Sequence, residues 1–336
     1  MNSEEFLAEW RSDSPYVRVQ TSGSTGEPKQ MLVEKRRMLA SARITCDFLR
    51  LQEEDTALLC MSLDYIAGKM MVVRAIERGL RLMVQEPTGH PLAIQKGQSL
   101  MCFSGNAHEG QSPCVTFAAM VPMQVWNSLQ VAEERLRLME IRHLIIGGGA
   151  IDDALAAELK TFPNAVWSTY GMTETLSHIA LRRLSGPEAS DWYTPFDSVH
   201  LSLSDEGCLI IDAPEVCSKQ LVTNDIAEIR SDGRFRILGR KDNVICSGGI
   251  KIQAEEVERQ LSAYLRVPYL ITKRHDPKFG EVVVLLTEGS VDEAHQVCER
   301  ILPKYHQPHA YIHVKQIPLT ATGKPARQQA EALARE

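Results

Sequence analysis

The sequence has no Cys-x-x-Cys pair, no long apolar run and no excess of positive charge. Its eight cysteines are scattered, which favours reduced thiols in a cytoplasmic protein over disulfides or a zinc site. No stretch approaches membrane-spanning length, so we expect no stable membrane insertion. The acidic start of the chain does not resemble a secretory signal. A net charge of −6 gives no basic face, which argues against nucleic acid as a partner.

What is present is the composition of a globular protein with a sizeable core. Of the 336 residues, 44% are apolar and 24% are charged, and a chain of this length is expected to form two domains. In the first half, apolar runs such as 57–61 and 80–84 alternate with helical patterns such as 66–78. This alternation predicts an α/β fold with a largely parallel sheet.

The pattern changes twice further along the chain. After about residue 176 the apolar runs are short and closely spaced, with turn residues between them, which predicts a small β-rich subdomain. From about Arg240, strands and helices are mixed again, as in an α+β domain. We therefore expect a large N-terminal domain over residues 1–239 and a small C-terminal α+β domain over residues 240–336.

A glycine- and hydroxyl-rich stretch begins twenty residues into the chain, Thr21-Ser22-Gly23-Ser24-Thr25-Gly26-Glu27-Pro28-Lys29. Its glycines allow backbone N–H groups to converge on an anion, and the hydroxyls and the lysine add donors, so the stretch is suited to phosphate. It is not a Walker A loop, because the second glycine lies three residues before the lysine. The alternative is a solvated turn between a strand at 16–20 and a helix at about 35–49.

Two further loops follow apolar strands. The run Ile146-Gly147-Gly148-Gly149-Ala150 would let backbone approach a flat ligand, although a tight strand-to-helix turn explains it as well. Residues 168–175 carry an aromatic ring, hydroxyls and a carboxylate on one short loop. There Tyr170 could pack against a base or ribose, Thr173 could bond a phosphate and Glu174 could help hold Mg²⁺. The alternative is a capped turn with a surface glutamate.

Two charged features complete the set. Asp225 could accept hydrogen bonds from both ribose hydroxyls, with Arg240 adding a donor, although the pair could equally be a surface ion pair across two strands. Near the C-terminus, Lys324 follows a glycine in the stretch 318–327. Such a lysine is usually only solvated, but the prolines on both sides argue for a fixed loop.

Taken together and in this order, these sequence motifs resemble those of the acyl-adenylate-forming superfamily, which includes acyl-CoA synthetases, adenylation domains and luciferases. The resemblance runs from Thr21 to Arg327 and implies an ATP-dependent enzyme with Mg²⁺. It implies that the loop from Thr21 to Lys29 binds the ATP phosphates and that Asp225 and Arg240 hold the ribose. The phosphate-loop residues would be Thr21, Ser22, Gly23, Ser24, Thr25, Gly26 and Lys29. The adenine-site residues would be Gly148, Gly149, Ala150, Tyr170, Gly171 and Met172.

The resemblance also implies a mechanism in two half-reactions. Thr173 would contact the α-phosphate, Glu174 would help place Mg²⁺, and Asp242 would be a hinge about which a mobile C-terminal domain rotates. Lys324 would serve adenylation, and the turn Ser247-Gly248-Gly249 would serve thioester formation with CoA. An ammonium aimed at the negative charge between carboxylate and α-phosphate is worth about 3–4 kcal/mol.

Within the superfamily, residues 62–71 and 170–182 resemble the o-succinylbenzoate–CoA ligases of menaquinone biosynthesis. That acid has a second carboxylate, for which Lys69 and His178 are the candidate partners, although each could instead have a structural role. Other acids, a carrier-protein acceptor in place of CoA, and a non-catalytic adenylate-binding module remain alternatives.

Two features of the sequence depart from the superfamily pattern. Only twenty residues precede the phosphate loop where a long N-terminal subdomain is usual, so we expect a shortened ligase. A homodimer would be one way to cover the sheet edge that this leaves exposed. Asn224 stands where the superfamily's Thr-Gly-Asp string has its glycine, a mild change because asparagine tolerates positive φ.

Overall fold

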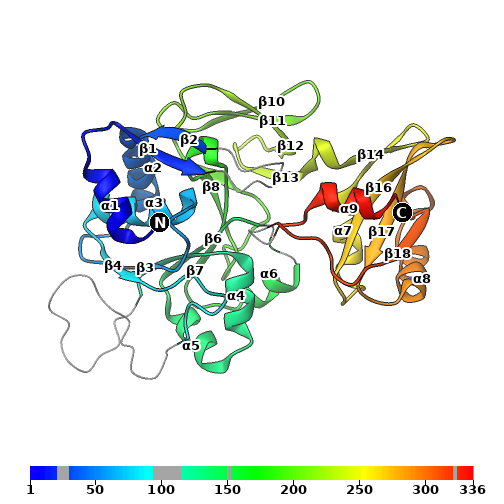
Figure 1. Cartoon of the computed structure of the whole chain (residues 1–336), viewed down its shortest axis with the longest axis horizontal. Helices are drawn as coiled ribbons and strands as arrows, with labels where there is room; N and C mark the ends of the chain where they lie inside the picture. Colours follow the sequence, from blue (N-terminus) through cyan, green and yellow to red (C-terminus); the bar gives the residue numbers. More distant parts are fainter. Residues whose placement is uncertain (21–29, 94–114, 150, 152, 321–323, 336) are drawn as a thin grey trace.

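The computed structural model describes residues 1–20, 30–93, 115–149, 151, 153–320 and 324–335. Figure 1 shows two lobes, a large one that holds most of the chain and a small one formed by the elements after β13. The predicted phosphate loop, Thr21 to Lys29, and Ala150 lie outside the described residues.

A seven-stranded sheet forms the centre of the large lobe. Its first five strands in spatial order are parallel. At one edge the sixth strand pairs antiparallel with the fifth, and the seventh pairs antiparallel with the sixth. The strands in spatial order are β4 (Arg81–Val84), β3 (Thr56–Leu59), β5 (Phe117–Met120), β6 (His143–Ile146), β7 (Ala165–Gly171), β8 (His178–Arg183) and β9 (Thr194–Pro195). Strands β3 and β5 are buried along their whole length, as expected where helices cover both faces.

Helices pack on both faces of this sheet. Successive residues of β3 alternate between two buried clusters, with Leu59 in the cluster under α2 and α3 and Leu58 in the cluster under α4, α5 and α6. The helices of the large lobe are α1 (Ser3–Arg11), α2 (Lys35–Phe48), α3 (Ile66–Arg78), α4 (Pro122–Leu129), α5 (Ala132–Glu140) and α6 (Asp153–Leu159). Between α1 and α2, β1 (Tyr16–Gln20) and β2 (Gln30–Glu34) pair antiparallel.

A second sheet of the large lobe is antiparallel throughout, in the order β10-β11-β12-β13. Its strands are β10 (His200–Leu203), β11 (Cys208–Asp212), β12 (Leu221–Ile229) and β13 (Phe235–Arg240). Tight turns connect β10 to β11 and β12 to β13 at Gly207 and Gly233, which both have positive φ. The pairing places Asp225 of β12 directly opposite Arg240 of β13.

The small lobe is a five-stranded sheet with helices. Its strands are β14 (Val244–Ser247), β15 (Ile250–Gln253), β16 (Tyr269–Asp276), β17 (Gly280–Thr287) and β18 (Ala310–His313). Helices α7 (Ala254–Leu261) and α8 (Val291–Ile301) contribute to one buried cluster, and α9 (Arg327–Leu333) contributes to the other. Among the described residues, short 3₁₀ turns lie in the large lobe at η1 (Thr173–Thr175), directly after β13 at η2 (Lys241–Asn243), and in the small lobe at η3 (Lys304–His306).

This architecture confirms the predicted fold class, an α/β sheet followed by a β-rich sheet and an α+β unit. The predicted boundary at residues 239 and 240 falls at the end of β13, and the division into domains stays a prediction. In the described ranges, no helix combines the length and the apolar character needed to cross a membrane. The six cysteines that the structure describes are all free thiols.

Candidate active site

The turn after β6 lies at the carboxyl end of the parallel sheet. Gly148 has a φ of +81°, which favours glycine, and a Cβ on Gly147 would lie 2.4 Å from Oγ1 of Thr169 on β7. The close approach of Thr169 therefore explains Gly147, and the positive φ explains Gly148. Contact of this turn with adenine stays a prediction.

Tyr170 lies at the end of the neighbouring strand β7 and reaches the second sheet. Its hydroxyl donates to Oδ2 of Asp225 at 2.6 Å, and its ring meets Phe235 edge-on at 5.2 Å. Burial, together with the Asp225 carboxylate, raises the pKa of the Tyr170 phenol, so this group remains a donor. The structure thus brings together two residues predicted from separate motifs, 55 positions apart.

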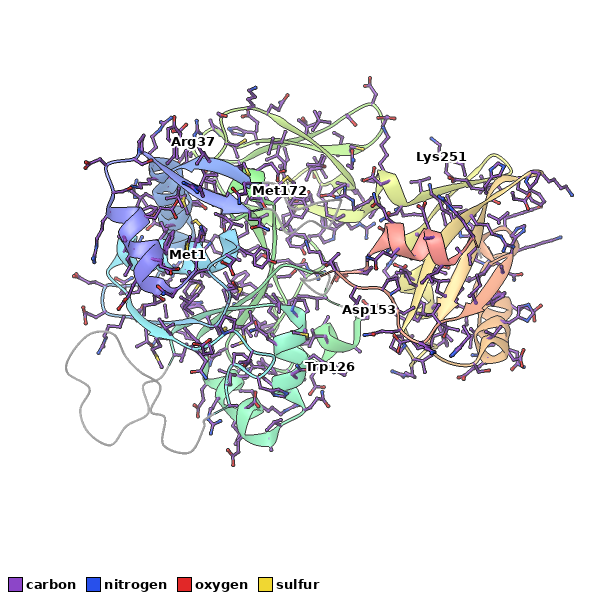
Figure 2. All side chains as sticks on the ribbon, in the orientation of Figure 1. Met1, Arg37, Trp126, Asp153, Met172 and Lys251 are labelled. Carbon is purple, nitrogen blue, oxygen red and sulfur yellow. The ribbon has the colours of Figure 1, made fainter. Side chains whose placement is uncertain are left out.

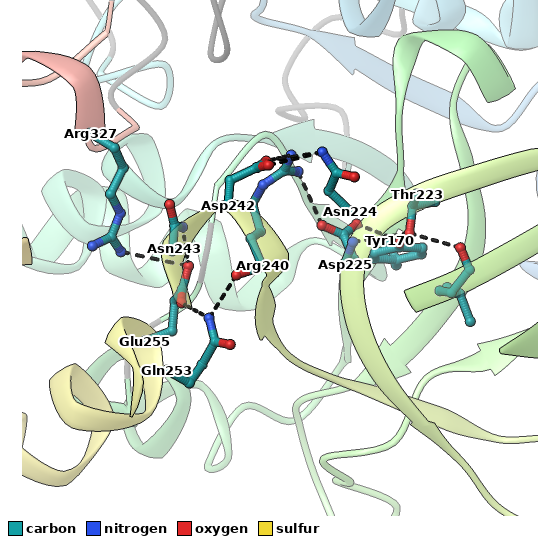
Figure 3. A network of polar contacts seen from close by, with 11 residues as sticks. Tyr170, Thr223, Asn224, Asp225, Arg240, Asp242, Asn243, Gln253, Glu255 and Arg327 are labelled. Carbon is teal, nitrogen blue, oxygen red and sulfur yellow. Dashed lines mark hydrogen bonds and ion pairs between the residues drawn. The ribbon is translucent and has the colours of Figure 1, made fainter. Parts of the chain in front are cut away.

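Asp225 also pairs with Arg240. Nη1 of Arg240 lies 3.1 Å from Oδ1 of Asp225, whose side chain is only 13% exposed. Nη2 of the same guanidinium donates to Asp242 at 2.8 Å. Figure 3 shows these side chains converging between β12, β13 and η2. The cross-strand ion pair, which the sequence left open as an alternative, is therefore present, and contact of this pair with a ribose stays a prediction.

Lys324 comes from the small lobe. Its backbone N–H donates to Oγ1 of Thr320 at 3.1 Å, and its carbonyl oxygen accepts from the backbone N–H of Thr320 at 2.7 Å. These two bonds fix the backbone of Lys324 against Thr320. Burial and the Arg240 charge lower the pKa of the Lys324 ammonium, and Asp225 partly offsets them. The charges of two residues of the large lobe therefore contribute to the pKa of a lysine of the small lobe.

The η1 turn follows Tyr170 on the same loop. A Cβ on Gly171 would lie 2.2 Å from the carbonyl oxygen of Ser177, so glycine is needed where β7 and β8 come closest. Thr175 is buried, and its hydroxyl accepts from N–H of Met172 at 3.0 Å, which fixes the turn. Glu174 is exposed. Within the described ranges no group of three or more His, Cys, Asp or Glu residues could hold a metal ion.

The predicted thioester-state turn belongs to a separate element. Gly248 and Gly249 have φ values of +56° and +87° and form the two-residue turn between β14 and β15. Among the described residues, no hydrogen bond or ion pair joins Ser247 to Asp225, Arg240 or Lys324. The hydrogen bonds that the structure describes at the candidate site therefore join Tyr170, Asp225 and Arg240, and the role of the turn at Ser247 stays a prediction.

The two lobes make further polar contacts. Oγ of Ser262 at the end of α7 donates to Oδ2 of Asp153 at 3.3 Å, and Figure 2 labels Asp153 on the side of the large lobe that faces the small one. Nε2 of Gln253 donates to the carbonyl oxygen of Arg240 at 2.9 Å. Both contacts hold α7 and the strand before it against the large lobe.

The two candidate partners for a second substrate carboxylate have other contacts. The Lys69 ammonium donates to the carbonyl oxygen of Arg18 at 2.5 Å and lies over the Phe6 ring. Both ring nitrogens of His178 have hydroxyl partners, Thr45 at 3.1 Å and Ser177 at 3.2 Å. Burial, with a smaller effect of the Arg74 charge, holds the pKa of His178 well below its usual range, so the ring is neutral.

Sequence reasoning missed Arg74, a buried cation on α3. Its side chain is 2% exposed, and Nη2 donates to Oγ of Ser177 at 2.6 Å. Its buried Nε has no hydrogen-bond partner among the described residues. Burial lowers the pKa of this guanidinium to about 10, so it remains charged at neutral pH. The available signal was a single arginine within a helix segment that is otherwise mostly apolar, Met70 to Ala75.

Comparison with known proteins adds a family match. The family described as AMP-binding enzyme matches residues 3–215. A 2-succinylbenzoate–CoA ligase from Enterococcus faecalis (strain ATCC 700802 / V583) is 25% identical, over 98% of this chain and 72% of that protein. The solved structure of an acyl-CoA synthetase (AMP-forming)/AMP-acid ligase II-like protein from Dyadobacter fermentans DSM 18053 is 31% identical with a TM-score of 0.63, covering 97% of this chain and 92% of that one.

A further solved structure is similar in fold. It is an o-succinylbenzoate coenzyme A synthetase from Bacillus subtilis, solved in complex with ATP and magnesium ion. The TM-score is 0.72 at 21% identity, over 93% of this chain and 69% of that one. The likeness shows that the two chains share a fold.

Proposed function

The chain belongs to the family of AMP-binding enzymes, and we propose that it joins o-succinylbenzoate to CoA through an acyl-adenylate. Family membership confirms the predicted superfamily and the predicted enzyme class, an ATP-dependent acid–CoA ligase that forms AMP. The choice of acid is supported by the 2-succinylbenzoate–CoA ligase of Enterococcus faecalis, which is similar over 98% of this chain. The product would serve menaquinone biosynthesis in the cytoplasm.

The observation that supports catalysis most strongly is the convergence of Tyr170, Asp225 and Arg240 from two sheets of the large lobe. The charges of Asp225 and Arg240 also contribute to the pKa of Lys324, which belongs to the small lobe. In the proposed reaction, Asp225 and Arg240 hold the ribose of ATP, and Lys324 stabilises the negative charge that develops as the acid attacks the α-phosphate. The bond to pyrophosphate breaks as the bond from the carboxylate oxygen to phosphorus forms.

Thr173 and Glu174 are also suited to binding ATP together with Mg²⁺. Glu174 offers an exposed carboxylate on the loop that carries Tyr170, and Mg²⁺ bound to nucleotides uses one or two such groups. Thr173 precedes it in η1 and would contact the α-phosphate. Mg²⁺ would neutralise charge on the phosphates. The hydroxyls, the glycines and Lys29 of the phosphate loop remain part of the proposal from sequence.

Arg74 is the side chain best suited to the second carboxylate of the acid. Lys69 already bonds a backbone carbonyl, and neutral His178 supplies no charge. Arg74 is buried and charged, and it makes no ion pair with any carboxylate that the structure describes. A buried charge of this kind is stabilised strongly by a charged partner. We therefore assign it to the acid, with His178 and Ser177 orienting the guanidinium.

A two-stage assay tests the proposed function. Purified protein, ATP, Mg²⁺ and o-succinylbenzoate should exchange labelled pyrophosphate into ATP, and CoA should then yield the acyl thioester. Absence of exchange with any carboxylic acid would contradict adenylation. Exchange without a CoA thioester would favour a carrier protein as the acceptor, and exchange only with another acid would replace the substrate.

A further inference from the structure

A side-chain contact joins the two sides of the predicted domain boundary. Asn224 lies on β12, next to Asp225, and its Nδ2 lies 3.1 Å from each carboxylate oxygen of Asp242. Asp242 lies in η2, two residues after Arg240. Figure 3 shows the Asn224 amide and the Arg240 guanidinium meeting at this carboxylate.

The strands of the large lobe supply every side-chain hydrogen bond that the structure describes for Asp242. Asn224 donates from β12, and Arg240 donates from β13 at 2.8 Å. Partial burial raises the pKa of Asp242, but the bonds from Arg240 and Asn224 outweigh it and keep the pKa below its usual range. The predicted hinge carboxylate is thus an anion held by the large lobe.

A rotation of the small lobe about the N–Cα bond of this residue would disturb the contact. Rotation about the N–Cα bond of Asp242 turns its Cβ together with the residues that follow. The carboxylate would then move away from the Asn224 amide, whose strand stays with the large lobe. The contact stabilises the arrangement of the two lobes in which the charges of Asp225 and Arg240 contribute to the pKa of Lys324.

The superfamily resemblance alone does not predict this contact. The superfamily resemblance leads us to expect glycine at position 224, and glycine has no side chain to donate. Asn224 is exposed, and it alternates along β12 with buried Thr223 and half-buried Asp225, so its side chain is free of the core. The sheet itself therefore does not require asparagine at this position.

We propose that Asn224 is a positioning residue that favours the adenylation arrangement of the two lobes over the thioester-forming one. The inference rests on the proposed function, because it requires two half-reactions that use two arrangements. Since both side chains are exposed, the effect is modest. A hydrogen bond of this kind changes an equilibrium about two- to tenfold.

Substitutions at this position test the proposal. Asn224→Ala and Asn224→Gly remove the donor, and Asn224→Gln keeps an amide with a longer reach. Val222→Ala is a matched control, because Val222 is two residues away on the same exposed face of β12 and is 67% exposed. For each variant, pyrophosphate exchange reports adenylation, and the release of AMP from supplied acyl-adenylate with CoA reports thioester formation.

We expect the ratio of the thioester rate to the adenylation rate to rise about two- to tenfold in Asn224→Ala and Asn224→Gly. The ratio should return toward the wild-type value in Asn224→Gln and stay unchanged in Val222→Ala. A purely structural role would lower both rates together with the melting temperature. Such a parallel loss, or an unchanged ratio, would overturn the proposal.

A second readout does not depend on finding the acid. Hydrogen–deuterium exchange of the peptide that contains residues 241–247 should be faster in Asn224→Ala than in the wild type and in Val222→Ala. If no acid supports pyrophosphate exchange, the proposed function fails while this comparison still decides the role of Asn224. Equal hydrogen exchange in the three proteins would contradict that role.

Discussion

At the scale of single residues, burial distinguishes Arg74 from the other arginines that the structure describes. Most arginines form ion pairs at the surface, where each pair contributes little. Arg74 instead lies inside the fold with a hydroxyl and a sulfur as its described partners. Sequence alone could not reveal this, because Ser177 lies 103 positions away and the two meet only through packing of α3 against the loop before β8.

The assignment of Arg74 to the acid predicts a selective effect of Arg74→Met. The KM for o-succinylbenzoate should rise about 10- to 100-fold, because a charge-assisted hydrogen bond is worth about 1.5–3 kcal/mol. The KM for ATP should stay unchanged. The same aromatic acid without its second carboxylate is the control substrate, and it should show no difference between wild type and variant. An equal rise for both acids would contradict the assignment.

The lowered pKa of the buried His178 ring leads us to predict how the free energy of unfolding depends on pH. Burial holds the pKa of its ring well below the usual range, whereas the unfolded chain titrates near 6.5. Between these two values the unfolded chain binds a proton that the folded chain does not, so stability is complete above about pH 6.5 and falls as the pH decreases. The slope is about 1.4 kcal/mol per pH unit for this one group.

The measurement is urea unfolding of His178→Gln and wild type at pH 7 and pH 5. The variant should lose less stability on acidification than the wild type does. His200→Gln is the control, because His200 is exposed on β10, and it should keep the wild-type slope. Identical slopes in all three proteins would refute the prediction for His178.

At the scale of elements, apolar runs predicted most of the strands and helices of the large lobe. The helix predicted at 66–78 matches α3, and the apolar run at 80–84 contains β4. The hairpin β14–β15 was not predicted as strands, because exposed and buried residues are mixed along it. Helix α1 was also missed, since Phe6 is its single fully buried residue. Its capping box at Asn2 and Glu5 was the available signal.

The close approach of β7 and β8 predicts a strong effect of Gly171→Ala. The added Cβ would meet backbone atoms of Ser177 and His178 at 2.2 and 2.5 Å, so the strands must separate and carry Tyr170 with them. We expect a loss of about 1–3 kcal/mol in stability, together with a loss of adenylation measured at a temperature where the variant is folded.

Gly233→Ala serves as the matched control. This glycine has a φ of +81° in the turn between β12 and β13, and an added Cβ would meet nothing within 4 Å. Its replacement should cost about 1 kcal/mol through backbone strain and leave pyrophosphate exchange unchanged. If both variants lost adenylation equally, the close approach at Gly171 would not be what positions the site.

At the scale of the whole molecule, the site depends on both lobes. Tyr170, Asp225 and Arg240 come from the two sheets of the large lobe, and Lys324 comes from the end of the small one. Sequence predicted each of these residues from its own motif and its order in the chain. Their convergence required the fold, because strand pairing and the contacts between the lobes determine which residues meet. The cross-lobe bonds of Asn224 and Gln253 could not be read from any motif.

The most direct test of the account is a comparison of the two half-reactions in Lys324→Ala. Adenylation of o-succinylbenzoate, measured by pyrophosphate exchange, should fall about 10²- to 10³-fold, because one preorganised cation at the α-phosphate is lost. Release of AMP from supplied acyl-adenylate by CoA should stay within about twofold of wild type. Lys315→Ala, at an exposed lysine of the same C-terminal segment, should change neither rate. Equal loss in both half-reactions of Lys324→Ala, or full activity in both, would contradict the account.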